Sequence, residues 1–311
     1  MWRDRSTRAL LIAAAVLALL LLVSHFWSPR SRDRSFRDVV MTLDTAAVTG
    51  FSIFPSAPGH RELRFDRSPA GWTVSDEGGS HRADDGRVRE FLGGHAHMRA
   101  KRLTGFMDLV KERYDLTDSL RETVVFRLVD GAERTVHYGR NTFAPGNVGM
   151  WSAVNLPGER EVFAVEGTMS MYAEQPLDEW RTKWLVRGDP AHVRSLRFHY
   201  SMDTAFTVER RGGTWMVDAD TADQSKVDGY LASLMQARAQ AFADTVNIAG
   251  LAPDYSLEVG FDDGRAPITV NVFTGWSALV AVSSLDPGSK LRFDTMRELP
   301  RMFRTRGHFL P

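Results

Sequence analysis

Residues 206–239 read FTVERRGGTWMVDADTADQSKVDGYLASLMQARA, a strand-like segment followed by a helix-like one. Phe206 and Val208 alternate with polar residues and lead to Trp215, which is typical of strands with one buried face. The apolar residues Val227, Tyr230, Leu231 and Leu234 then fall at i, i+3, i+4 and i+7, which predicts an amphipathic helix.

The same pattern occurs earlier in the chain. Residues 63–100 read LRFDRSPAGWTVSDEGGSHRADDGRVREFLGGHAHMRA, in which Gly71-Trp72 takes the place of the Gly213 to Trp215 segment. Trp72 precedes Trp215 by 143 positions and Val88 precedes Val227 by 139, so the second loop is four residues shorter. This internal repeat predicts two related halves, with helices near residues 84–101 and 223–241.

A hairpin signal follows each predicted helix. Asp130-Gly131 and Asp263-Gly264 each separate two runs in which apolar and polar residues alternate. An Asp-Gly pair in this setting is a strong local signal for a tight β-turn. The alternating apolar residues are Val124, Phe126, Leu128, Val136 and Tyr138 in the first half, and Leu257, Val259, Phe261, Ile268, Val270 and Val272 in the second.

These patterns predict an α+β fold. We expect an N-terminal transmembrane helix followed by two tandem repeats, each an antiparallel sheet with a covering helix. The predicted divisions are 1–37 for the cytoplasmic tail, anchor and basic stop, 38–176 for the first repeat, and 177–311 for the junction and second repeat.

The amino-terminal region indicates a membrane anchor. Every residue from Ala9 to Val23 is apolar, and the uncharged stretch reaches Trp27. Nineteen helical residues extend about 28 Å, close to the roughly 30 Å of a bilayer core. A cleaved signal peptide is the alternative, but no small-x-small cleavage pair follows the run. We expect an uncleaved signal anchor at residues 9–27, in the cytoplasmic (inner) membrane, with the body on the periplasmic face.

Charge and composition exclude several classes of protein. The chain has 39 basic and 39 acidic residues and no cysteine, which removes disulfide scaffolds, thiolate metal sites and cysteine nucleophiles. Residues 1–37 hold seven arginines against two aspartates, so the rest has 32 basic and 37 acidic residues. A mildly acidic body gives no basic footprint for nucleic acid.

Catalytic and metal motifs are missing from the sequence. Walker, nucleophile-elbow and zinc-helix patterns do not occur, so we expect no enzymatic activity and no cofactor. His95 and His97 are candidate metal ligands by residue type, but at the repeat offset His95 aligns with Leu234. We therefore expect a packed histidine beside an exposed one, and no metal.

The junction between the repeats holds the one candidate site. Trp180 and Trp184 lie four residues apart and are accompanied by Arg181 and Arg187. These four residues predict a surface for a ligand or partner between the repeats. The alternative is a hydrophobic plug that only joins the two halves.

The chain resembles the bacterial domain-of-unknown-function family 4340, the gliding-motility-type ABC transporter auxiliary proteins. The resemblance covers about residues 45–300. It is carried by Gly71-Trp72, the Asp-Gly hairpins, Gly250-Leu251-Ala252-Pro253, and the run Trp180-Arg181-x-Lys183-x-Leu185.

The resemblance implies a membrane-anchored, non-catalytic accessory or scaffold protein of an ABC-type transport system. Its expected partners are an ABC permease and its ATPase, contacted by the extracytoplasmic repeats. The alternative function is an envelope module that binds a small molecule, lipid or polymer in the crevice between the repeats.

Overall fold

The computed structural model describes residues 16, 36–56, 61–144, 146, 149–201, 204–275, 279–294 and 296–311. The predicted anchor at residues 9–27 therefore lies outside the described part of the chain, apart from residue 16. Within the described part, no helix is long and apolar enough to cross a membrane.

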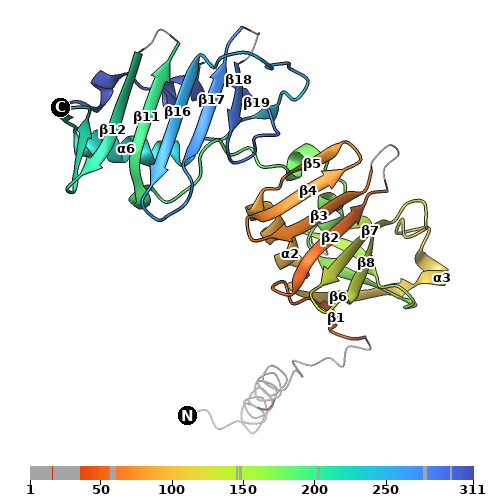
Figure 1. Cartoon of the computed structure of the whole chain (residues 1–311). Helices are drawn as coiled ribbons and strands as arrows, with labels where there is room; N and C mark the ends of the chain where they lie inside the picture. Colours follow the sequence, from red (N-terminus) through yellow and green to blue (C-terminus); the bar gives the residue numbers. More distant parts are fainter. Residues whose placement is uncertain are drawn as a thin grey trace, which may run out of the picture.

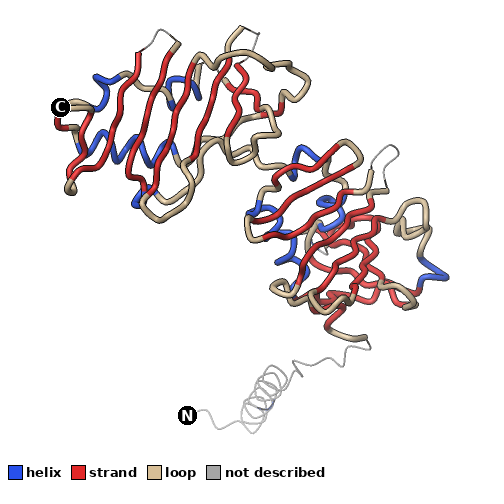
Figure 2. The backbone as a smooth tube through the Cα atoms, viewed as in Figure 1, coloured by secondary structure: helices blue, strands red, loops and turns tan. Residues whose placement is uncertain are grey.

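The described chain is an α+β protein built on two antiparallel sheets (Figure 1), as predicted. In both halves strands hold far more residues than helices, and the helices are few and short (Figure 2). The first sheet runs in the order β1-β6-β10-β9-β8-β7-β2-β3-β4-β5. Its strands are β1 (Val39–Thr42), β2 (Val48–Phe54), β3 (Leu63–Ser68), β4 (Gly71–Asp76), β5 (Gly79–Arg82), β6 (His97–Phe106), β7 (Glu122–Leu128), β8 (Glu133–Phe143), β9 (Met150–Asn155) and β10 (Glu161–Glu166).

The second sheet runs in the order β14-β13-β12-β11-β16-β17-β18-β19-β15. Read from the opposite end, this is the order of the first sheet without β1, so the described strands correspond one to one. The shared order confirms the internal repeat. The strands are β11 (Val193–Tyr200), β12 (Thr204–Arg211), β13 (Thr214–Val217), β14 (Asp220–Thr221), β15 (Ala241–Phe242), β16 (Tyr255–Phe261), β17 (Ile268–Phe273), β18 (Leu279–Ser283) and β19 (Leu291–Phe293).

Each repeat has a central strand that the sequence patterns did not identify. β2 pairs with both β3 and β7, and β11 pairs with both β12 and β16. The register shifts at equivalent points, between Val48 and Gly50 and between Val193 and Ser195. These strands join the two halves of each repeat into one continuous sheet.

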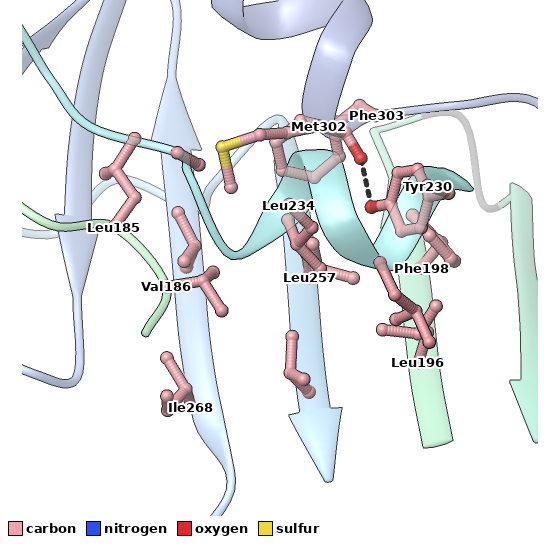
Figure 3. Close-up of a cluster of buried hydrophobic side chains, with 14 of the residues drawn as sticks. Leu185, Val186, Leu196, Phe198, Tyr230, Leu234, Leu257, Ile268, Met302 and Phe303 are labelled. Carbon is pink, nitrogen blue, oxygen red and sulfur yellow. Dashed lines mark hydrogen bonds between the residues drawn. The ribbon is translucent and has the colours of Figure 1, made fainter. Parts of the chain in front are cut away.

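One amphipathic helix covers a face of each sheet: α2 (Asp85–Ala96) in the first repeat and α6 (Gln224–Leu234) in the second. The predicted face of α6 is fully buried against the second sheet, where Tyr230 also donates a hydrogen bond to the Met302 carbonyl at 2.5 Å (Figure 3). In α2 the buried residues are Val88, Phe91, Leu92 and His95.

The predicted helices are too long at their carboxyl ends. α2 ends at Ala96 and α6 at Leu234, and the residues after Ala96 form β6. Met98 and Ala100 are buried while Arg99 between them is exposed, a period of two that fits a strand. Gly93 and Gly94 weaken the helix just before this change.

Short helices complete both repeats. The first has α3 (Met107–Val110), α4 (Met169–Ala173) and α5 (Leu177–Trp180). The second has η2 (Pro190–His192), α7 (Glu298–Met302) and η3 (Arg306–Phe309). One hydrophobic core includes Trp180 and belongs to the first sheet, and another begins at Leu185 and belongs to the second.

Candidate functional site

The connection between the repeats is bonded to both of them. On the first repeat, Thr182 N–H donates to the Arg82 carbonyl at the end of the edge strand β5. On the second repeat, Leu185 N–H donates to the Ala237 carbonyl, and Ala239 N–H donates to the Lys183 carbonyl. The connection thus extends the backbone hydrogen bonding of both halves.

Trp180 is the residue where the chain leaves the first core. Its side chain is fully buried, and its ring meets Phe91 of α2 edge-on, with centroids 5.4 Å apart. It ends α5, so Trp180 and Trp184 do not share a helix face. A ligand therefore cannot reach Trp180 in this conformation.

Arg181 is buried and holds the two repeats together. Its guanidinium donates to Asp178 at 3.0 Å, to Asp244 of the second repeat at 2.6 Å, and to the Ser289 hydroxyl at 2.6 Å. The same group lies 3.7 Å above the ring of Phe242. Burying an arginine costs free energy unless carboxylates and hydrogen bonds compensate, and these contacts provide that compensation.

Trp184 and Arg187 lie at the surface of the junction. The Trp184 ring is half-buried. The guanidinium groups of Arg238 and Arg187 lie over it, 4.6 and 5.4 Å from the ring centroid. Such cation–π contacts orient an arginine and restrict its motion. The ring therefore acts as a support for two positively charged groups.

A cleft of about 360 Å³ lies at this junction, and three of the predicted residues line it. Arg181, Trp184 and Arg187 belong to the lining, whereas Trp180 does not. The basic residues of the lining are Arg87, Arg181, Lys183, Arg187 and Arg238, and the acidic ones are Asp84, Glu90 and Glu179. We call this space the junction cleft.

Each acidic residue of the junction cleft already has a partner. Glu179 accepts from Lys183 at 3.1 Å and from Arg87 at 3.4 Å, and the Lys183 hydrogen bond is the main reason that its pKa is lowered. Asp84 caps α2 and pairs with Arg238 at 3.1 Å, while Glu90 accepts from Tyr172.

The side chains that line the junction cleft are mostly charged. Among the described lining residues there is no serine, threonine, cysteine or histidine that could act as a nucleophile or proton shuttle. Arginine and lysine side chains recognise carboxylate and phosphate groups by charge-assisted hydrogen bonds. The arrangement is therefore suited to holding a negatively charged group.

Arg87 and Arg238 were not among the predicted site residues. Arg87 lies in the first turn of α2, where the helix dipole disfavours a cation. A cation at such an unfavourable position could have marked Arg87 as a candidate binding residue. Arg238 follows α6, and only folding brings it to the connection, through the isolated bridge between Trp184 and Arg238.

The two histidines considered by residue type, His95 and His97, lie in different surroundings. His95 is fully buried and its Nε2 lies 2.5 Å from the Tyr138 hydroxyl, whereas His97 is exposed at the start of β6. No group of three or more metal-binding side chains occurs among residues that the structure describes.

Comparison with known proteins gives a family. The family described as Domain of unknown function (DUF4340) matches residues 77–258, more than half of the chain. The chain therefore belongs to this family. No curated protein and no solved structure matches the chain.

Proposed function

We propose that this chain is a membrane-anchored, non-catalytic accessory protein of an ABC-type transport system. It acts through protein contacts made by its two extracytoplasmic repeats, and the apolar segment at residues 9–27 holds it in the cytoplasmic membrane. Membership of the DUF4340 family is consistent with this proposal.

The observation that carries the proposal is the firm connection of two large sheets. The buried Arg181 bridges the repeats, and Arg238 of the second repeat pairs with Asp84 at the start of α2 in the first. An accessory protein that positions partners needs two surfaces held at a fixed separation. The ion pairs and backbone bonds of the junction meet this requirement.

The test is co-purification of the tagged full-length chain from its native membrane in mild detergent. We expect an ABC permease and its ATPase to be recovered with the chain in a fixed ratio, and an untagged strain provides the background. Recovery of the chain without any transport component would contradict the proposal.

The junction cleft favours a second candidate function, an envelope module that binds a small molecule, lipid or polymer between the repeats. Its volume of about 360 Å³ falls within the range of small-molecule sites. This function predicts one bound ligand per chain. Tryptophan fluorescence during titration with envelope extracts tests it, and a flat response argues against it.

A further inference from the structure

The junction cleft has more positive charge than its own carboxylates neutralise. The buried Arg181 is occupied by Asp178, Asp244 and Ser289. The remaining four basic residues of the lining, Arg87, Lys183, Arg187 and Arg238, face three carboxylates, which leaves an excess of one positive charge. Glu179 alone serves both Lys183 and Arg87.

Arg187 is the lining residue with the most freedom to bind. Its side chain is exposed, and no carboxylate among the described residues forms an ion pair with it. The stacking of its guanidinium on Trp184 nevertheless orients the group. An oriented guanidinium loses less entropy when it forms hydrogen bonds with an oxyanion.

Arg87 contributes an unused donor. Its Nε is shielded from solvent and has no hydrogen-bond partner among the described residues, while one terminal nitrogen reaches Glu179 at 3.4 Å. A shielded donor without a partner is unfavourable, so a shift of the Arg87 side chain that brings this donor to an acceptor gains a hydrogen bond. Arg87 comes from the first repeat and Arg238 from the second.

From these observations we infer that the junction cleft binds a small anionic ligand through a phosphate or carboxylate group, held by Arg187 and Arg238, with Arg87 as a further cation of the same lining. The inference deepens the second candidate function and rests on it. The limited volume of the junction cleft selects a small ligand, and the two repeats both supply cations, so the ligand contacts both halves.

The experiment is calorimetric titration of the full-length chain in detergent with inorganic pyrophosphate and, separately, with succinate, at low and high salt. At least one of the two probes should bind at one site per chain, and the affinity should fall with salt because the contacts are ionic. The fluorescence of Trp184, isolated by comparison with Trp184→Phe, should change in the same titration.

Two substitutions with opposite expected effects, Arg187→Gln and Glu179→Gln, and one control make the test specific. Arg187→Gln should weaken binding about tenfold or more, the loss expected when a charge-assisted hydrogen bond is removed. Arg194→Gln, at an exposed arginine of β11 outside the lining, is the matched control and should leave the affinity unchanged. Glu179→Gln frees Lys183 and Arg87, so it should tighten binding severalfold, a gain that a poorly folded variant cannot produce.

The outcomes separate this inference from the functions above. If neither probe binds, or if Arg187→Gln and Arg194→Gln behave alike, the junction cleft is not an anion site, whatever co-purifies with the chain. Binding to vesicles of anionic lipid but to neither soluble probe would also overturn it, in favour of a membrane surface. A response to envelope extracts with no response to the two probes would leave the second candidate function standing without this ligand class.

Discussion

Trp180 and Phe309 occupy equivalent positions in the two repeats. The carbonyl of each accepts a 2.8 Å hydrogen bond from the backbone N–H of the aspartate that caps the covering helix, Asp84 or Asp223. Each ring also stands at 88° to an aromatic side chain of that helix, with centroids 5.4 and 5.1 Å apart. This equivalence supports a structural role for Trp180, the last aromatic side chain of the first core.

Replacement of Trp180 should destabilise the first repeat selectively. Trp180→Ala removes a fully buried side chain, which costs about 3 to 5 kcal/mol of unfolding free energy. Trp180→Phe should cost less, about 1 to 2 kcal/mol, because the indole N–H has no hydrogen-bond partner to lose among the described residues. Urea denaturation followed by circular dichroism measures both, and equal losses would show that the indole nitrogen is engaged.

His95 should make the stability depend on pH. Burial lowers the pKa of His95 from 6.5 to about 4, so between these values only the unfolded chain binds the proton. The contribution of neutral His95 to the free energy of unfolding is complete above pH 6.5 and is lost as the pH falls toward 4. The loss amounts to about 2 kcal/mol at pH 5.

Unfolding free energies at pH 7.5 and pH 5 measure this loss. The double variant His95→Leu, Tyr138→Phe removes both partners of the buried hydrogen bond and should reduce the difference. His137, whose pKa is also lowered to about 4, retains part of it. His199→Leu, at an exposed histidine, should leave the pH dependence unchanged, and an equal change in both variants would contradict the assignment.

Glu122 should oppose folding at alkaline pH. Burial, reinforced by the neighbouring Glu174, raises the pKa of Glu122 from 4.5 to about 9. The folded state then holds a proton that the unfolded state has released, so stability falls as the pH rises from 4.5 toward 9. Glu122→Gln should be more stable than the wild type by about 1 to 3 kcal/mol at pH 8, with little difference at pH 4.5. The comparison is with Glu112→Gln at an exposed site, and a variant no more stable at pH 8 than this control refutes the prediction.

Loss of Arg181 should uncouple the repeats. Arg181→Met removes the buried member of its ion pairs and leaves Asp244 and the buried Ser289 hydroxyl without that donor, at a cost of about 2 to 3 kcal/mol. We expect calorimetry to separate one unfolding transition into two, and a protease to cut between Trp180 and Leu185. Asp178→Asn at a half-exposed partner should cost less than 1 kcal/mol, as surface pairs do. A single transition in Arg181→Met would mean that other contacts couple the halves.

The repeat and its hairpins could be read from the sequence because their signals are local. The Asp130-Gly131 and Asp263-Gly264 turns lie between the expected strands, and both glycines have φ of 82°, a value that side chains disfavour. The helix face with Val227 and Leu234 is buried as expected. The central strands β2 and β11 were not predicted, because the repeated sequence pattern begins after them, at residues 63 and 206.

The candidate site could be predicted only in part because it depends on contacts between distant segments. Trp184 and Arg187 lie within six residues of Arg181 in the sequence, so the three could be grouped before the structure was known. Arg238 joins them through a backbone bridge to Trp184 that no local pattern encodes. The equivalence of Trp180 and Phe309 was hidden by their separation of 129 positions, which differs from the 139 of the helices.

The connection between the repeats is short and is held at both ends. Trp180 and Leu185 are each fully buried in a different core, and the residues between them are bonded on both sides. A segment of this kind transmits twisting and bending, so a displacement of one sheet is carried to the other instead of being absorbed by a hinge. Insertion of even one residue here would force either Trp180 or Leu185 out of its core. The exposed turns at Asp130-Gly131 and Asp263-Gly264 can take an insertion without such a loss.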